Sequence, residues 1–192
     1  MSEEEEDEPS AGRVLSPEEI DQTIGSLEAA VALQPSMRFA IAGGVAMQVY
    51  GYPLPTKDVD ALADKTFGDQ PYFEFFMPLS FGGKVYISRQ NEVQLDIIVR
   101  NDAYTSLYEE ALKHPIQYGG VPVLSPEYLA VIKFAAKRPK DLRALAWLLG
   151  VQGLVDAKKA GSIVHRTLGG QYALDVWNEY VRRIRLYWSR HR

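Results

Sequence analysis

The chain has 192 residues, 46% hydrophobic and 24% charged, and this ordinary composition excludes the disordered, collagen-like and coiled-coil classes. It contains no cysteine, which excludes disulfides, thiolate zinc sites and cysteine nucleophiles, so any metal must bind oxygen or nitrogen. The net charge of −4 is unevenly distributed, because the start is acidic and the part after Val131 is basic.

The chain opens with the acidic run MSEEEEDEPSAGR, which has almost nothing apolar to bury. Residues 1–14 are therefore predicted to be a disordered acidic tail. A signal peptide would instead be basic and then apolar, and no apolar run approaches the length of a membrane span. We expect a cytoplasmic protein with no membrane partner.

Local signals predict the first elements. Ser16 can cap a helix over residues 17–33, and Glu19 completes a capping box. The apolar run MRFAIAG ends in glycine and predicts a buried strand at residues 38–42. GVAMQVYG then predicts a helix of about two turns.

The next two segments are predicted to be a strand and a helix. DVDALAD alternates acidic and apolar residues, which predicts a strand with Asp58 and Asp60 on one side. The aromatic segment PYFEFFMPL is predicted to be a helix with Phe73, Phe76 and Met77 in the core.

The rest of the chain is predicted to be a hairpin followed by helices. KVYISRQNEVQLDIIVR reads as two strands around the turn RQNE, with Asp96 in the second strand. ALKHPIQYGGVPVLS is predicted to be a loop with short extended pieces. Three or four helices then run to the end, two of them beginning at Pro126 and Pro139. The predicted fold class is α/β, a small mixed β-sheet flanked by helices with a helical C-terminal region.

Several familiar catalytic motifs are missing from the sequence. It has no GxxxxGK[ST], GxGxxG, HExxH or GxSxG. The three histidines, His114, His165 and His191, lie far apart without partners at ligand spacing, so we expect structural or surface roles for them.

One segment has the features of a phosphate and metal site. Gly43 and Gly44 follow an apolar strand and begin a helix, where backbone N–H groups can meet phosphate oxygens. Asp58 and Asp60 repel one another, so a site that keeps both ionised normally needs a cation. Oxygen ligands favour Mg²⁺ or Mn²⁺. Asp96 lies in an apolar strand, and if that strand neighbours the first, three carboxylates converge as two-metal phosphoryl chemistry requires.

These residues also carry a family resemblance. AIAGGVAMQVYGYPLPTKDVDALAD resembles the signature of nucleotidyltransferases of the DNA polymerase β superfamily, in which hGG or hGS precedes DxD by about ten residues. The GGxA start, the TxDxD form and SPEYLAVIKFAAKRPKDLRALAWLL are similar to minimal bacterial nucleotidyltransferases related to the AbiEii toxins of type IV toxin–antitoxin systems. The resemblance covers roughly residues 38–150.

The resemblance implies a fold, an activity and a set of site residues. It implies a nucleotidyltransferase core at 15–124, a helical region at 125–192 packed on it, and transfer of an NMP from an NTP to an acceptor hydroxyl. RNA, in particular tRNA, and an antitoxin protein are the implied acceptor and partner. The implied metal ligands and catalytic acids are Asp58, Asp60 and Asp96, and the implied nucleotide-binding residues are Gly43, Gly44, Thr56, Lys133, Arg138 and Asp141.

Some alternatives remain open. Relatives often carry a basic residue where this chain has Leu54, which leaves a nucleotide-binding module without transfer activity as a second hypothesis. An antibiotic-modifying transferase is a third. Lys133 on its apolar helix can simply snorkel, and Arg138 and Asp141 can form an ion pair. The C-terminal VRRIRLYWSRHR fits either a nucleic-acid surface or an amphipathic helix that buries Val181, Ile184 and Trp188.

Overall fold

The computed structural model describes residues 13–34 and 36–190. The predicted acidic tail falls almost entirely on residues 1–12, which lie outside the described residues, as does His191. The strands are β1 Phe39–Ile41, β2 Val59–Ala63, β3 Phe73–Pro78, β4 Gly83–Ser88, β5 Gln94–Ile98, β6 Ile116–Tyr118 and β7 Val121–Val123. The helices are α1 Pro17–Ala32, α2 Gly43–Val49, α3 Thr105–Ala111, α4 Pro126–Ala136, α5 Pro139–Gly150, α6 Ala157–Thr167 and α7 Gly170–Arg190.

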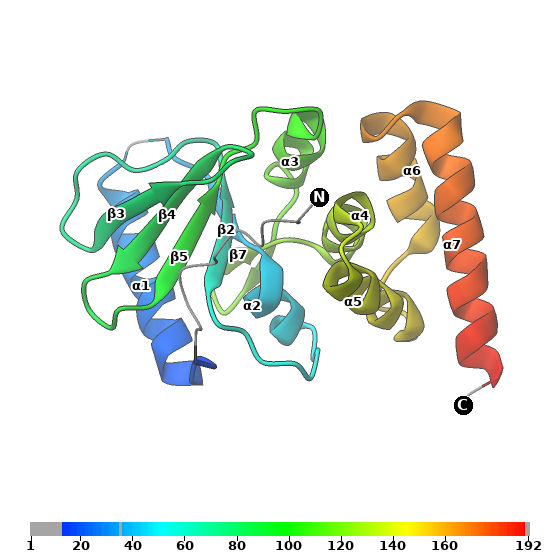
Figure 1. Cartoon of the computed structure of the whole chain (residues 1–192), viewed down its shortest axis with the longest axis horizontal. Coiled ribbons are helices and arrows are strands. Elements are labelled where there is room, and N and C mark those ends of the chain that lie inside the picture. Colours follow the sequence, from blue (N-terminus) through cyan, green and yellow to red (C-terminus); the bar gives the residue numbers. More distant parts are fainter. Residues whose placement is uncertain (1–12, 35, 191–192) are drawn as a thin grey trace, which may run out of the picture.

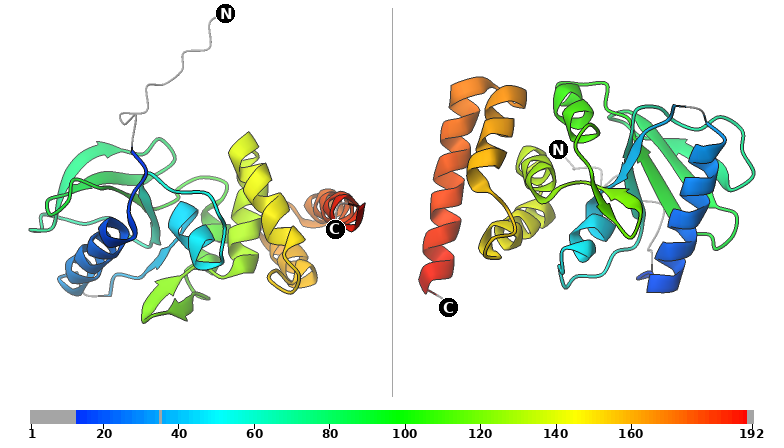
Figure 2. Two further views of the ribbon diagram at one scale, coloured as in Figure 1. Left: turned by 90° about the horizontal axis from the view of Figure 1, so that it is seen from below. Right: turned by 180° about the vertical axis from the view of Figure 1, so that it is seen from behind.

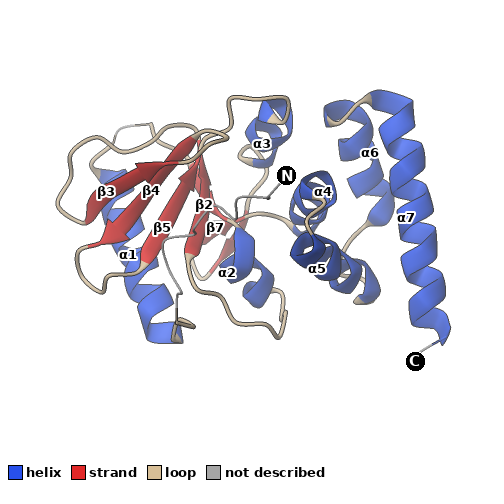
Figure 3. Cartoon of the chain, in the orientation of Figure 1, coloured by secondary structure: helices blue, strands red, loops and turns tan. Residues whose placement is uncertain are grey.

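The strands form one mixed sheet in the order β3-β4-β5-β2-β1-β7-β6. The pairs β2/β5 and β1/β7 are parallel, and the other neighbours are antiparallel. The sheet lies at one end of the molecule, and α4 to α7 are stacked at the other (Figure 1, Figure 3). The predicted α/β class, a mixed sheet flanked by helices with a helical C-terminal region, is confirmed.

Helix α1 begins as predicted and covers one face of the sheet. The Ser16 hydroxyl accepts a hydrogen bond from the Glu19 N–H at 3.3 Å, and Glu19 accepts one from the Ser16 N–H at 2.9 Å. Such a capping box satisfies N–H groups that the first helical turn leaves without partners. Leu27 and Ala30 are fully buried. Figure 2, seen from behind, shows α1 running across the strands.

Most of the aromatic segment at residues 71–79 forms the strand β3, so the prediction of a helix there is wrong. β3 is an edge strand that pairs antiparallel with β4, and a bulge between Phe75 and Met77 interrupts its alternation. Phe73 is buried, but Phe76 and Met77 are exposed. Strings of phenylalanine favour pleated structure, and the bulge adds a residue that imitates helical spacing.

The hairpin prediction is confirmed, and one helix had no counterpart among the predicted elements. β4 and β5 pair antiparallel around the turn at residues 89–92, with Leu95 and Ile97 buried. The loop predicted for residues 111–125 contains the short strands β6 and β7. Helix α3 directly precedes it and was not predicted; it is only seven residues long.

The C-terminal helices pack around Trp177 of α7. Its indole is fully buried, lies 5.2 Å from the Phe134 ring and donates a hydrogen bond to the Ala157 carbonyl at 3.1 Å. Val181 is buried on the same face of α7, whereas Arg182 and Arg183 are exposed. This arrangement favours the amphipathic-helix interpretation of the C-terminal segment. Within residues 13–34 and 36–190, no helix combines the length and apolarity that a bilayer-crossing segment needs.

Candidate functional site

The parallel pairing of β2 with β5 brings two of the predicted acids together. Asp60 and Asp96 are direct partners in the register of these strands. Paired residues of neighbouring strands project from the same face of a sheet, so the two carboxylates lie side by side. The condition that the sequence left open, adjacency of the two acidic strands, is therefore met.

Asp58 lies immediately before β2 and is tied to Thr56. The Thr56 hydroxyl is within hydrogen-bonding distance of the Asp58 carbonyl, at 3.0 Å, and of its carboxylate Oδ1, at 3.2 Å. Thr56 is itself buried, and its carbonyl accepts a hydrogen bond from the Leu15 N–H at 3.0 Å. The entry to α1 thus fixes the approach to β2, and Thr56 fixes Asp58. We refer to Asp58, Asp60 and Asp96 as the acid centre.

The glycine pair at the start of α2 is packed directly against this centre. A Cβ atom at Gly43 would overlap the Asp60 carboxylate, lying 2.5 Å from its Cγ, and Gly43 has a left-handed φ of 53°. A Cβ atom at Gly44 would lie 2.7 Å from the Thr56 Cβ. The two glycines are therefore required by close approach of the backbone to Asp60 and Thr56. The GG pair and the DxD triplet are two parts of one structure.

The acid centre has an unbalanced negative charge. The pKa of Asp60 is raised to about 7, first because the carboxyl is removed from water and then because Asp58 and Asp96 repel its ionised form. Lys133 and Lys140 act in the opposite direction without cancelling the shift. A bound divalent cation would relieve this repulsion.

The ligand chemistry of the acid centre fits a hard cation, but the side chains are not arranged as a finished site. Carboxylate oxygens are the ligands that Mg²⁺ and Mn²⁺ prefer. Across the described part of the chain, no group of three or more acidic or histidine side chains is arranged to hold a metal ion. Asp96 instead accepts a hydrogen bond from the Gln94 amide at 2.9 Å. Metal binding would require the three carboxylates to turn toward a common ion.

The remaining predicted site residues form a second cluster, at the junction between α4 and α5. Asp141 is fully buried, and its carboxylate accepts hydrogen bonds from Lys133 at 2.7 Å and from Arg138 at 2.5 Å. Burial opposes ionisation of Asp141, but these two bonds outweigh it and hold its pKa below the usual value. We call Lys133, Arg138 and Asp141 the junction triad. Lys133 therefore forms an ion pair with Asp141 and does not simply extend its ammonium group to solvent.

A sharp turn creates this junction. Lys137 ends α4 in the left-handed conformation with φ 58°, Arg138 is extended, and Pro139 begins α5. Proline suits the first position of a helix, and its ring keeps the preceding residue extended. The turn brings the basic residues of the junction near enough to Asp60 to act on its ionisation. Lys140 is one of them, and sequence reasoning missed it although it adjoins Asp141.

Leu54, His114 and His165 lie outside the acid centre. Leu54 is 52% exposed, and its carbonyl accepts a hydrogen bond from the Gln48 side chain at 3.1 Å. His114 stacks on Tyr128 with ring centroids 5.9 Å apart, and His165 is exposed on α6.

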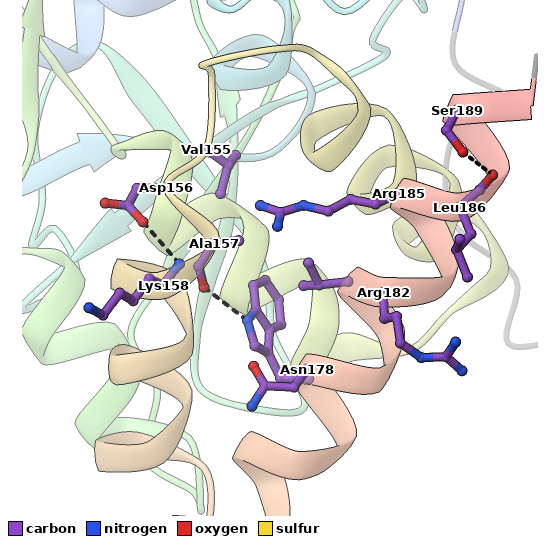
Figure 4. A pocket seen from close by; sticks show the side chains of 11 residues that line it. Val155, Asp156, Ala157, Lys158, Asn178, Arg182, Arg185, Leu186 and Ser189 are labelled. Carbon is purple, nitrogen blue, oxygen red and sulfur yellow. Dashed lines mark hydrogen bonds between the residues drawn. The ribbon is translucent and has the colours of Figure 1, made fainter. Parts of the chain in front are cut away.

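A groove of about 760 Å³ opens between the start of α6 and one side of α7 (Figure 4). It is lined by apolar and basic side chains, among them Trp177, Val181 and Arg185, and it shares no residue with the acid centre or the junction triad. In Figure 4, Arg185 extends toward Val155 at the start of α6. Size alone does not make a reactive site, and we place the candidate chemistry at the acid centre because its charges are unbalanced.

Comparison with known proteins gives only distant structural likeness. No family model matches the sequence, and no curated protein is significantly similar to it. The structure is similar to an antigenic nucleotidyltransferase-like protein from Paracoccidioides brasiliensis, with 17% identity and a TM-score of 0.46 over 88% of this chain and 95% of that one.

Two further solved structures are similar. A proposed nucleotidyltransferase from H. pylori has 12% identity and a TM-score of 0.47, covering 93% of this chain and 99% of its own. The antibiotic-resistance factor ANT(2'')-Ia has 14% identity and a TM-score of 0.39, over 88% of this chain and 94% of its own. At these values the likeness does not assign an activity to this chain.

Proposed function

We propose that this protein is a metal-dependent nucleotidyltransferase that moves an NMP from an NTP to an acceptor hydroxyl. One observation carries the proposal, the parallel register that sets Asp60 beside Asp96. The three carboxylates can supply oxygen ligands to a divalent cation. They lie beside the glycine backbone segment at the start of α2, and together these features suit phosphoryl transfer. The sequence resemblance to polymerase β-type nucleotidyltransferases points to the same reaction.

The acid centre would hold the divalent cation through Asp58, Asp60 and Asp96. When bound, the ion would supply electrostatic stabilisation of the attacking and leaving oxygens. Thr56 orients Asp58 through its hydroxyl, and Gly43 leaves room for the Asp60 carboxylate. The triphosphate would meet the backbone N–H groups of Gly43 and Gly44 at the start of α2.

The transfer needs one proton acceptor among these residues. The acceptor hydroxyl oxygen attacks the α-phosphorus, the bond from that phosphorus to the β-phosphate oxygen breaks, and pyrophosphate leaves. We assign the hydroxyl proton to Asp96, whose Oδ1 accepts a hydrogen bond from Gln94 and is thereby oriented. Positioning and charge stabilisation then supply most of the rate.

The junction triad would meet the phosphates from the helical side. Lys133 is 15% exposed and Arg138 is 59% exposed, so Arg138 can reach a ligand more easily. Asp141 holds both cations in place rather than touching the nucleotide. We extend the proposal to the division of the chain, with the transferase core at 15–124 and a helical region at 125–192.

The acceptor that we propose is an RNA such as a tRNA. Exposed basic residues at the junction and on α7, including Lys140, Arg143 and Arg185, would suit a polyanion. A role as a toxin with an antitoxin partner, in the cytoplasm, rests on the sequence resemblance. The genes that flank this one test that role cheaply, because a toxin of this kind is encoded beside its antitoxin.

A second candidate function, nucleotide binding without transfer, is favoured by one observation. Both basic side chains implied to meet phosphate are already bonded to Asp141. A protein that has lost transfer can retain such a satisfied cluster, because binding requires less precise geometry than catalysis.

The deciding experiment measures transfer of radioactive α-phosphate. Each of the four NTPs, labelled at the α-phosphate, is incubated with Mg²⁺ and total RNA, using wild type, Asp58→Ala and the exposed-loop control Asp69→Ala. Label on RNA with wild type and Asp69→Ala, but not with Asp58→Ala, supports the transferase. NTP binding by wild type without transfer to RNA or to an aminoglycoside panel would favour the binding module instead.

A further inference from the structure

One part of the sheet face that carries the acid centre has no helix over it. On the opposite face, α1 covers the strands, and the paired residues Val59, Leu95 and Tyr86 are buried. On the acid face, α2 packs on β2, but none of the described helices lies in front of β5, β4 and β3 (Figure 1). Gln94 and Ile87 on this face are accordingly partly exposed. This open part of the sheet directly adjoins the acid centre.

A row of paired residues leads from the acid centre across this open part to the edge of the sheet. Asp60 of β2 is paired with Asp96 of β5. Val85 of β4 is paired with Asp96 on one side and with Met77 of β3 on the other. Paired residues of neighbouring strands project from the same face, and neighbouring strands lie about 4.8 Å apart. Met77 therefore lies about 10 Å from Asp96 along the sheet.

A second row lies beside the first. Gln94 of β5 is paired with Ile87 of β4, and Ile87 is paired with Glu74 of β3. The Glu74 carboxylate forms an ion pair with Arg89 at 3.2 Å. We call the residues of both rows on β3, β4 and β5 beyond Asp96 the edge strip, which consists of Glu74, Met77, Val85, Ile87 and Gln94. The middle of the edge strip is apolar, and the charge of Glu74 is balanced by Arg89.

A bulge in β3 places Met77 in the edge strip. Phe75 is paired with Tyr86 and packs edge-on against its ring, with ring centroids 6.3 Å apart, so Phe75 projects from the face opposite the acid centre. In a regular strand Met77 would project from that same face, because residues two positions apart do so. The register shift between Phe75 and Met77 turns Met77 to the acid face instead. Bulges are common beside active sites, where they redirect a side chain in this way.

The geometry of phosphoryl transfer determines the side from which the acceptor approaches. The attacking oxygen and the leaving pyrophosphate lie roughly in line, on opposite sides of the α-phosphorus. Gly43 and Gly44, which are proposed to meet the triphosphate, lie on the α2 side of Asp60. Asp96 lies on the other side of Asp60, toward β4 and β3. The acceptor hydroxyl should therefore approach over the edge strip.

We propose that the edge strip binds the terminal nucleoside of the acceptor RNA, with its ribose hydroxyl at Asp96 and its base against Ile87 and Met77. The inference rests on the proposed function, because it needs an NTP at the acid centre. A span of about 10 Å accommodates one nucleoside, and the apolar side chains of Ile87 and Met77 suit the face of its base. A polycationic aminoglycoside would need unbalanced carboxylates, whereas Glu74 is paired with Arg89.

The test measures binding of a short single-stranded RNA, labelled in the middle of its chain, by fluorescence anisotropy. Mg²⁺ and an NTP analogue that cannot be cleaved between its α- and β-phosphates are present. Met77→Glu places a negative charge on the edge strip and should weaken RNA binding roughly tenfold. Met77→Lys also removes the apolar contact but attracts phosphate, so it should weaken RNA binding by about threefold at most. The affinity for the analogue alone, measured by calorimetry, should stay within about twofold of wild type in both variants.

Phe75→Glu is the matched control, because Phe75 lies on the same strand but projects from the opposite face of the sheet. The two side chains are both exposed, Phe75 by 53% and Met77 by 39%. Phe75→Glu should leave both affinities within about twofold of wild type. Thermal unfolding shows whether each variant folds. If Met77→Glu does not fold, Ile87→Ser should instead weaken RNA binding by several-fold and leave analogue binding unchanged.

The outcomes separate the edge strip from the proposed function. If wild type binds the analogue and the RNA, but Met77→Glu weakens RNA binding no more than Phe75→Glu does, the edge strip is not the acceptor site and the proposed function stands. If wild type binds the analogue and neomycin but no RNA, and Met77→Glu strengthens neomycin binding, the acceptor is a cationic small molecule and the proposal of RNA is overturned. If wild type does not bind the analogue, the proposed function and the edge-strip proposal both fall.

Discussion

Two groups of charged side chains lie near one another in this molecule and differ in how their charges are balanced. In the acid centre, three carboxylates lie near one another, and repulsion by Asp58 and Asp96 adds to burial in raising the pKa of Asp60 to about 7. In the junction triad, one buried carboxylate holds two cations at 2.7 and 2.5 Å, and its pKa is lowered.

The difference separates a group that costs stability from a group that contributes to it. A balanced buried ion pair is costly to break, because removal of one partner leaves the other uncompensated. An unbalanced cluster of like charges costs free energy, which a bound cation would lower. Substitutions in the two groups should therefore have opposite effects on stability.

The largest expected effect is on activity at the acid centre. Asp60→Asn should lower transfer by roughly a thousandfold or more, because a metal ligand worth several kcal/mol in the transition state is lost. Its stability at about pH 8 should rise by roughly 1–3 kcal/mol, since a repelled, partly buried charge is removed. Steady-state transfer assays and urea unfolding measure the two quantities, with Asp69→Asn as control. A less stable Asp60→Asn would contradict the account of charge imbalance.

The junction triad should respond in the opposite way. Asp141→Asn should destabilise the fold by about 3 kcal/mol, because Lys133 and Arg138 lose their shared buried partner. Exposed Asp175 on α7 is the matched position, and Asp175→Asn should cost less than about 0.5 kcal/mol. Denaturant midpoints of the two variants give the comparison. Equal denaturant midpoints for Asp141→Asn and Asp175→Asn would mean that the junction triad stabilises the fold no more than a surface ion pair does.

The glycine pair should show that the acid centre depends on close backbone approach. Gly43→Ala should abolish transfer, because its Cβ overlaps the Asp60 carboxylate. Gly51 also has a positive φ, of 89°, but a Cβ atom at this position would have no neighbour within 4 Å. Gly51→Ala should therefore cost only about 1–2 kcal/mol of stability, from backbone strain, and keep transfer activity. Loss of transfer activity in both Gly43→Ala and Gly51→Ala would mean that backbone strain, and not overlap with Asp60, causes the effect.

The smallest expected effect is on the pH dependence of stability without metal. Because the folded-state pKa of Asp60 lies above its unfolded value of about 4, the folded state holds the extra proton between about pH 4 and 7. This contribution to stability should therefore be greatest below about pH 4 and decline as pH rises to about 7. Asp60→Asn should flatten this decline, whereas Asp175→Asn should not. Urea midpoints across this range provide the measurement, and an identical slope in Asp60→Asn would refute the assignment.

The sequence predicted what depends on local signals. The Ser16–Glu19 capping box, the β4–β5 hairpin and the alternation around Asp96 follow from residues within a few positions of each other, and each is found in the structure. β3 was mistaken for a helix because a bulge at Phe75 and Met77 disguises its alternation. The bulge depends on pairing with β4, which the segment itself does not encode.

The candidate site depends on distant contacts in the same way. The acids were recognised from their spacing, but the register of Asp60 with Asp96 depends on strand order, which alternation cannot specify. Packing of Gly43 against Asp60 was also not foreseen; the glycines were interpreted only through their backbone.

The most direct test of the central claim is to locate a bound cation. Crystals grown with Mn²⁺ and an NTP analogue that cannot be cleaved between its α- and β-phosphates should show an anomalous scattering peak between Asp58, Asp60 and Asp96, with carboxylate oxygens at roughly 2.0–2.3 Å. The triphosphate should then lie against Gly43 and Gly44. An NTP bound elsewhere, or Mn²⁺ bound away from these three carboxylates, would contradict the account.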